Sequence, residues 1–339
     1  MSRSKLRIVG WIFAALIVLL AIAVTATIGW RPFIGPSARA LTDRRFSATP
    51  ERLERGRYLA ENVGTCFACH SEREWSKPDA PEVAGTHGAG THGFPLAGLP
   101  GSVRPPNITP DKETGAGAWT DDQLARAIRE GIGYDGRALF PMMPYENFRY
   151  LSDEDLASLI VYLRSIPPVR RQLPKTELIF PVKYLIRSAP HPITAEVPAA
   201  DQSTPVKRGE YLVTIAGCRD CHTPMANGQR LATFDLGGGD FLQGPWGAVS
   251  SANITQSPSG IPYYDEGLFL DVMHTGWVKA RQLKQIMPWW YYRNMTDEDL
   301  KSIFAYLRTV PTIQHRVDNS KPPALCKLCG LTHNGGDMN

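Results

Sequence analysis

The longest apolar stretch of the chain lies near its start. Residues 8–28 form a run of 21 positions without a charged side chain, and Arg3, Lys5 and Arg7 precede it. As an α-helix this run would span about 31 Å, close to the ~30 Å hydrocarbon core of a bilayer. Basic residues before the run, with no acidic ones, predict that the N-terminus stays in the cytoplasm and the rest is exported. We therefore predict a membrane anchor over residues 1–30.

A cleaved signal peptide is the alternative interpretation of this segment, because Ala38 and Ala40 provide small residues suited to a cleavage site. The apolar core of a signal peptide usually has about 7–15 residues, and this run is longer. We expect an uncleaved anchor. Either interpretation places the body of the protein outside the cytoplasm.

Helix signals recur in the same order in two later parts of the chain. Thr49-Pro50 and Thr204-Pro205 each place an N-cap residue before a proline, and Ser152 and Thr296 begin capping patterns. Apolar stripes follow the last two caps, at Leu156, Leu159, Ile160 and Leu163 and at Leu300, Ile303, Phe304 and Leu307. We expect two more helices at about 120–130 and 266–275, each ended by a glycine. Sustained period-two alternation is missing from the sequence, which predicts an all-α fold.

These helices belong to an internal repeat. Each copy contains Cys-x-x-Cys-His, Asn-Ile-Thr, Met-Pro and a Ser/Thr-Asp-Glu-Asp-Leu segment, in that order. From the Met to the Ser or Thr is nine residues in both copies, and from the His to the Asn is 37 residues in one and 31 in the other. The repeat predicts two homologous modules. Their bounds are 49–168 and 206–313, with a linker at 169–205 that holds six prolines and a tail at 314–339.

The distribution of charge bears on the expected partners, and the size of each module bears on what fills its core. The chain has 339 residues with 37 basic and 33 acidic side chains, and residues 1–48 carry seven of the basic ones and one acidic one. The basic excess therefore lies at the N-terminus, and we expect no nucleic-acid partner. Each module has about 110 residues with short helices and long loops, too few to bury a sufficient core. A large apolar group is expected to fill the centre.

The cysteines identify that group. Cys-x-x-Cys-His is the attachment pattern of c-type haem, in which two thiols bind one porphyrin edge and the histidine binds the iron. The predicted attachment residues are Cys66 and Cys69 with His70 and, in the second copy, Cys218 and Cys221 with His222. Redox-active or structural CxxC pairs are the alternative, but two matches at equivalent positions favour two covalently bound haem c groups.

A sixth iron ligand is expected from the Met-Pro pairs. Met143 and Met287 lie 73 and 65 residues after their histidines, and a following proline suits a ligand held in one conformation. Met142 has no counterpart in copy two, and Met273 has none in copy one. An iron bound from both sides has no position for a substrate. The site therefore predicts one-electron transfer.

Several motifs of the first copy carry a resemblance to a known family: Asn107-Ile-Thr-Pro-Asp, Trp119-Thr-Asp-Asp, Asp135-Gly-Arg, Met143-Pro-Tyr and Leu151-Ser-Asp-Glu-Asp-Leu. They are similar to those of the cytochrome c subunits of membrane-bound bacterial alcohol, sugar and gluconate dehydrogenases. The resemblance implies cytochrome c folds and a periplasmic location. Those relatives commonly carry three haem domains, whereas the repeat predicts two tandem cytochrome c domains here. The predicted anchor, a single N-terminal transmembrane helix in the bacterial inner membrane, is a second departure from the family pattern. The resemblance also implies electron receipt from a periplasmic or membrane-bound dehydrogenase subunit, with a quinone, a cytochrome or a terminal oxidase downstream.

Two other classes of protein remain as alternatives. A di-haem enzyme, such as a peroxidase or a thiosulfate-oxidising cytochrome, needs an iron with an open or displaceable position, and a Met in both modules argues against it. An exported structural protein with CxxC disulfides leaves the histidines and the Met-Pro pairs unexplained.

Two further motifs have less certain meaning. Cys326 and Cys329 are followed by Gly330 where a haem site needs a histidine. A disulfide is the favoured interpretation in an oxidising compartment, and a metal site with His333 or a decayed haem site are the alternatives. His87 and His92 lie in a glycine-rich loop, for which we favour a solvated loop over metal binding.

Overall fold

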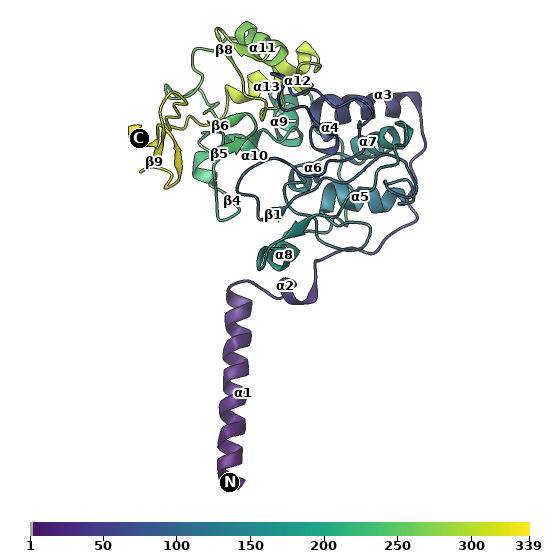
Figure 1. Cartoon of the computed structure of the whole chain (residues 1–339), viewed down its shortest axis with the longest axis vertical. Helices are drawn as coiled ribbons and strands as arrows, with labels where there is room; N and C mark the ends of the chain where they lie inside the picture. Colours follow the sequence, from purple (N-terminus) through teal and green to yellow (C-terminus); the bar gives the residue numbers. More distant parts are fainter. Residues whose placement is uncertain (1–2) are drawn as a thin grey trace.

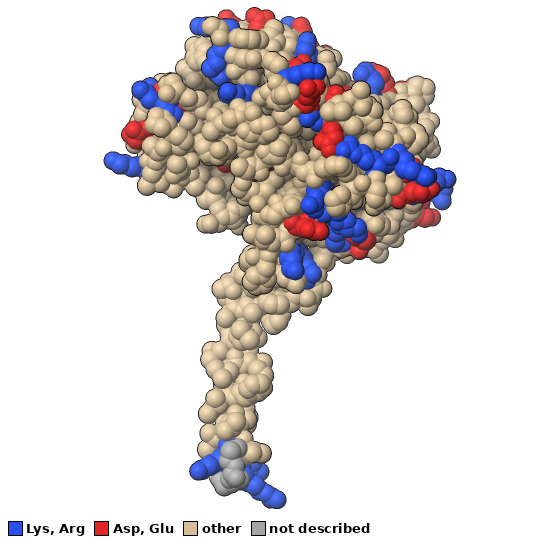
Figure 2. All heavy atoms as spheres, viewed as in Figure 1, with Lys and Arg blue, Asp and Glu red and all other residues tan. Residues whose placement is uncertain are grey.

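The computed structural model describes residues 3–339, and a long helix projects from a rounded body (Figure 1). This helix, α1 (Arg3–Ala26), buries none of its residues against the protein and is long and apolar enough to cross a membrane. Figure 2 shows basic side chains at its free end and uncharged residues along its length. A short helix, α2 (Arg31–Ile34), follows where the rod meets the body.

The body contains two series of helices in the same order. In residues 49–168 they are α3 (Pro50–Tyr58), the π-helix η1 (Leu59–Val63), α4 (Cys66–His70), α5 (Asp121–Glu130), α6 (Tyr145–Phe148) and α7 (Asp153–Ser165). In residues 206–313 and just before them they are α9 (Pro205–Ile215), α10 (Cys218–His222), α11 (Glu266–Thr275), α12 (Trp289–Tyr292) and α13 (Asp297–Leu307). We call these two parts the first and the second module.

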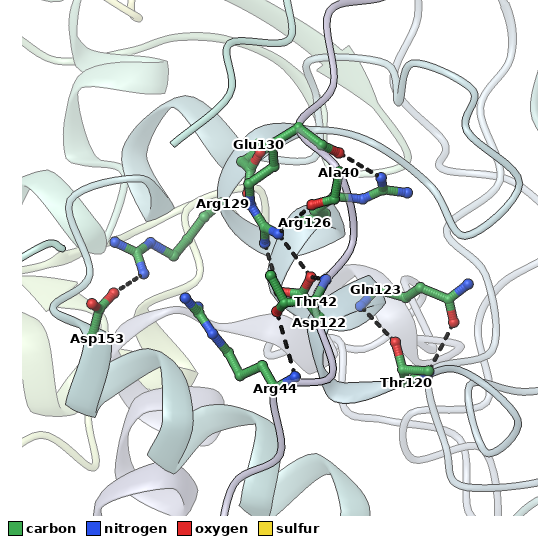
Figure 3. Close-up of polar contacts among 11 residues, drawn as sticks. Ala40, Thr42, Arg44, Thr120, Asp122, Gln123, Arg126, Arg129, Glu130 and Asp153 are labelled. Carbon is green, nitrogen blue, oxygen red and sulfur yellow. Dashed lines mark hydrogen bonds and ion pairs between the residues drawn. The ribbon is translucent and has the colours of Figure 1, made fainter. Parts of the chain in front are cut away.

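Side-chain caps explain where the helices begin. Thr49, Thr204, Ser152 and Thr296 each accept a hydrogen bond from the backbone N–H three residues on, as the sequence predicts. Helix α5 has a complete capping box, in which Thr120 accepts from the backbone of Gln123 and returns its own N–H to the Gln123 side chain (Figure 3). The expected helices at 120–130 and 266–275 are confirmed within one residue.

In each module the first and last helices cross at a glycine. A Cβ on Gly56 of α3 would lie 1.9 Å from the carbonyl oxygen of Ser158 on α7, and one on Gly209 of α9 would lie 1.9 Å from that of Ser302 on α13. A larger side chain would force each pair apart, so glycine permits the close crossing. The apolar faces around both crossings belong to one continuous hydrophobic core.

The prediction of a wholly α-helical fold needs correction, because the structure contains five short antiparallel strand pairs. They are β1 (Gly101–Ser102) with β2 (Glu177–Leu178), β3 (Met225–Ala226) with β4 (Gln229–Arg230), β5 (Phe241–Gly244) with β6 (Gly247–Ser250), β7 (Trp277–Val278) with β8 (Arg281–Gln282) and β9 (Pro323–Leu325) with β10 (Thr332–Asn334). Strands of two to four residues are too short to show a period-two pattern in the sequence.

The linker packs along the surface of the first module. Its strand β2 pairs with β1, and the carbonyl of Val197 accepts from the backbone of Asp153 at the start of α7. The short helices α8 (Val182–Leu185) and η2 (Ile186–Ser188) pack against α2, where Arg187 donates to the carbonyl of Pro32. Two further 3₁₀ turns complete the described elements, η3 (Ala232–Phe234) and η4 (Gly336–Met338).

Equivalent residues of the two modules bind each other reciprocally. The phenol of Tyr58 donates to Asp299 over 2.5 Å, and the phenol of Tyr211 donates to Asp155 over 2.6 Å. Each carboxylate also pairs with an arginine of its own module, Arg55 with Asp155 and Arg208 with Asp299. The contact thus has an approximate two-fold symmetry within one chain, which fixes the modules relative to each other.

Candidate haem-binding sites

The two Cys-x-x-Cys-His segments adopt the same local structure. Each forms a five-residue helix, α4 or α10, and a left-handed residue precedes it, Thr65 with φ 44° or Gly217 with φ 70°. Since residues three apart lie on one helix face, the two thiols of each segment point the same way. All four cysteines are free and partly buried.

Both histidines have the hydrogen bonding and charge state that metal binding through Nε2 requires. His70 Nδ1 lies 2.7 Å from the carbonyl oxygen of Pro106, and His222 Nδ1 lies 2.7 Å from that of Ala252. Because a carbonyl only accepts, each Nδ1 carries the proton, and each Nε2 keeps a free lone pair. Burial lowers the pKa of both imidazoles, which keeps them neutral. This second contact orients a ligand histidine and raises its basicity.

The Asn-Ile-Thr motif holds the carbonyl that binds each histidine. In the first module Asn107 Oδ1 accepts from the backbone and the hydroxyl of Thr109, while Asn107 Nδ2 donates to the carbonyl of Val169 over 2.8 Å. Asn253 makes the same bonds to Thr255 and to the carbonyl of Ile313. In the sequence this motif is only a landmark of the repeat. Its role could not be predicted, because backbone acceptors leave no signal in a sequence.

The thiols do not have the character of a redox-active CxxC pair. Burial raises the pKa of Cys66 to about 12 and that of Cys69 to about 11. Burial also raises the pKa of Cys218 to about 12. Reactive CxxC motifs depend on the opposite shift, toward a stable thiolate. These thiols suit attachment to a cofactor better than disulfide exchange.

The two Met-Pro pairs occupy equivalent turns. Met143 directly precedes Pro144, the N-cap of α6, and Met287 directly precedes Pro288, the N-cap of α12. Both methionine side chains are partly buried against the same core as Cys66 and Cys218.

The alternative ligands named from the sequence have other surroundings. Met273 is a core residue of α11 with 6% of its surface exposed. The neighbouring His274 pairs with Asp297 over 3.0 Å and with the carbonyl of Arg293 over 2.8 Å. The structure therefore gives Met273 a packing role in the second module.

Orphaned polar groups next to Met287 fit a bound group that carries acceptors. The indole Nε1 atoms of Trp289 and Trp290 are buried without a hydrogen-bond partner among the described residues. An unpaired buried N–H costs about 1–3 kcal/mol. Haem carries two propionates that can accept hydrogen bonds, so these two indole donors are compatible with it.

Tyr292 lies beside the attachment segment of the second module. Burial raises the pKa of the Tyr292 phenol well above its usual value. Tyr292 donates to the carbonyl of Ala216, just before α10. This bond holds α12 against the start of the second attachment segment.

The glycine-rich loop differs from the solvated loop that we expected. His87 stacks on Phe67 at a centroid distance of 3.8 Å and lies 3.3 Å from Glu61 and 2.9 Å from Glu82. Burial acts to lower its pKa, but the two carboxylates outweigh it and raise the pKa to about 9. His92 is exposed, as expected. His87 is therefore part of an ion-pair network of the first module.

Comparison with known proteins shows the family to which this chain is similar. The cytochrome c family profile matches residues 53–167. The chain is 32% identical over 82% of its length to the fructose dehydrogenase cytochrome subunit of Gluconobacter japonicus, covering 57% of that protein, and 34% identical over 61% of its length to the gluconate 2-dehydrogenase cytochrome c subunit of Pantoea cypripedii, covering 46%. It is 30% identical over 74% of its length to a diheme cytochrome c-type protein of Cereibacter sphaeroides, covering 84%.

The chain belongs to the cytochrome c family, whose members carry covalently bound haem c. This confirms the resemblance to cytochrome c subunits of dehydrogenases. The chain spans about half the length of the dehydrogenase cytochrome subunits that it matches.

Proposed function

We propose that this protein is a membrane-anchored periplasmic di-haem cytochrome c that passes single electrons from a dehydrogenase to a quinone, a cytochrome or a terminal oxidase. The observation that carries the proposal is the equivalence of the two Cys-x-x-Cys-His sites. Each has a histidine with Nδ1 bound to a backbone carbonyl and Nε2 free. Relatives that are named as cytochrome subunits of dehydrogenases support a dehydrogenase as the electron donor.

The chain's own residues would set the chemistry of each site. When bound, haem supplies an iron that cycles between ferric and ferrous states by one electron. Cys66 and Cys69, and Cys218 and Cys221, would hold the ring by thioethers. His70 and His222 would bind one side of each iron. Met143 and Met287 would provide neutral thioethers on the other side, which favour the ferrous state and raise the potential.

The packing between the modules would keep two haems at a fixed separation. Arg73 of the first module lies over the rings of Trp290 and Tyr291 of the second, at 4.6 Å and 5.6 Å from their centroids. Tyr291 donates to Glu82 of the first module over 2.8 Å. These contacts lie beside the attachment segments, so they support electron transfer between haems within one chain.

Contacts of the segment after the apolar helix support its retention as an anchor. Arg39 pairs with Asp122 over 2.7 Å and with Glu130 over 2.8 Å, and the backbone N–H of Thr42 donates to Asp122. Figure 3 shows how this segment lies against α5. Cleavage after Ala40 would remove Arg39 and its two ion pairs from the protein, so these contacts support an intact N-terminus.

A haem stain and an absorption spectrum of the full chain test the proposal. After expression with a haem-ligation system and extraction from membranes in detergent, we expect two covalent haems per chain and an oxidised band near ~695 nm typical of Met ligation. Met143→Ala and Met287→Ala should each remove part of that band and lower one potential, whereas the control Met142→Ala should change neither. A high-spin spectrum with fast peroxide turnover would favour the enzyme alternative.

A further inference from the structure

Four metal-ligating side chains converge beneath the C-terminal hairpin. They are His315, Cys326, Cys329 and His333, and their ligand atoms all lie within 4.8 Å of one another. His315, Cys326 and His333 have 0% of their surface exposed. Cys326 and Cys329 are both free, so the disulfide favoured from the sequence is not formed in the structure.

The hydrogen bonds of the two histidines leave a lone pair on each Nε2 atom, and these lone pairs face each other in an arrangement that suits a bound cation. His315 Nδ1 donates to the carbonyl of Gly237 over 3.0 Å, and His333 Nδ1 donates to that of Asn334 over 3.2 Å. Both Nε2 atoms therefore carry lone pairs, and they face each other at 3.1 Å. Two acceptors at this distance repel each other unless a positive centre lies between them.

The separations match a tetrahedral zinc centre. Zinc binds sulfur at ~2.3 Å and imidazole nitrogen at ~2.05 Å, so tetrahedral geometry places two nitrogens about 3.3 Å apart and a nitrogen and a sulfur about 3.6 Å apart. The two Nε2 atoms are 3.1 Å apart, and Cys326 Sγ lies 3.6 Å from His315 Nε2. A Cys₂His₂ set without an open position is typical of structural zinc sites.

We propose that His315, Cys326, Cys329 and His333 bind one structural zinc ion, which holds the C-terminal hairpin on the second module. The hairpin is shaped for this role, since Cys326 follows β9, His333 lies in β10, and the left-handed Gly330 turns the chain after Cys329. Because the two cysteines lie in a turn between strands, the segment lacks the helix found at α4 and α10, which argues against a decayed haem site.

The zinc site would support the proximal histidine of the second module. Gly237 accepts from His315, and the next residue, Gly238, donates its N–H to the carbonyl of His222 over 2.7 Å. Gly239 allows the close approach, because a Cβ there would lie 2.6 Å from the His315 ring. One short segment thus joins the four ligands to the predicted iron ligand.

The hairpin is also fastened to the strand pair of the same module. Asn334 N–H donates to Ser250 Oγ of β6, and this hydroxyl donates to Asn334 Oδ1, both over 2.9 Å. Asn319 Oδ1 accepts from the backbone of Ser250 and its amide returns a bond to the same residue. A zinc ion would close a structure that hydrogen bonds already hold in place.

Elemental analysis of the full, haem-loaded chain tests the proposal. Native protein purified without chelators should contain one zinc, measured against its haem iron. Cys326→Ser with Cys329→Ser, and separately His333→Ala, should reduce zinc at least about tenfold. The matched control His92→Ala, which changes an exposed histidine, should keep it. Haem content is read separately by its stain, so a failure of this proposal is distinguishable from a failure of the electron-transfer proposal.

If the variants fail to fold and are not recovered, the zinc content of the unmodified chain can be tested instead. A mercurial reagent should release one zinc per chain to a chromogenic chelator, because it competes for the thiolates. Absence of stoichiometric zinc, a non-haem iron in its place, or a Cys326–Cys329 disulfide in the native chain would each overturn the proposal.

Discussion

The first and second modules hold the loop behind the proximal histidine in different ways. In the first, Gly90 N–H donates to the carbonyl of His70, and Arg171 binds both the Gly90 carbonyl and Glu72. In the second, Gly238 makes the bond to His222, and the loop is held by His315. Arg171 and His315 each lie two residues after the carbonyl that the motif asparagine binds.

In both modules a side chain holds the loop behind the histidine of the attachment segment, but the chemistry of that contact differs. An arginine–glutamate pair with a 2.7 Å contact serves in the first module, where the side chains are 21% and 28% exposed. In the second, two buried histidines, the buried Cys326 and the partly buried Cys329 converge. A partly exposed ion pair stabilises weakly, whereas a metal site couples its binding energy to folding. The second module should therefore depend more on its support.

The largest effect should come from removing haem attachment in one module at a time. Cys66→Ser with Cys69→Ser, and Cys218→Ser with Cys221→Ser, should each halve the haem bound per chain, because each site serves its own module. A haem stain with quantitative absorbance measures this. Loss of all haem from either variant would contradict independent sites.

The supports behind the histidines should differ in strength. His315→Ala should lower the melting temperature by on the order of 10 °C, because it would remove one ligand of the proposed zinc site and leave Cys326, Cys329 and His333 without their partner. Arg171→Ala should lower it by about 4 °C, as expected for a partly exposed ion pair. Thermal unfolding followed by circular dichroism of the haem-loaded chain measures both. Equal shifts would remove the distinction between the modules.

The reciprocal tyrosines should behave alike. Tyr58→Phe and Tyr211→Phe each remove the phenolic hydroxyl that donates to a carboxylate of the other module. Each should lower the free energy of unfolding by about 1 kcal/mol. Chemical denaturation measures the free energy of unfolding. A clear difference between the two would show that the interface is less symmetric in energy than in geometry.

The smallest effect should be a pH dependence that belongs to the first module. The folded pKa of His87 is raised to about 9, above the ~6.5 of an unfolded histidine. Its stabilisation should therefore be complete below about pH 6.5 and be lost as the pH rises through about 9. His87→Gln should flatten the melting temperature over this interval, while the exposed control His92→Gln should leave it unchanged.

Much of the fold could be predicted because its signals are local. Caps at Thr49, Ser152 and Thr296 act on N–H groups three residues away, so the helix starts were readable. The strand pairs were missed because they are short. The ion pair of His87 with Glu61 was missed because Glu61 lies 26 residues away in the chain.

The sequence alone determined the two attachment segments and their repeat, because the spacing of Cys, Cys and His within one helical turn fixes how these side chains point. Tertiary structure decided which carbonyls orient His70 and His222, how Tyr58 and Tyr211 join the modules, and that His315 lies with Cys326, Cys329 and His333. These contacts depend on long-range packing of loops and hairpins, and separation along the chain does not reveal which of them form.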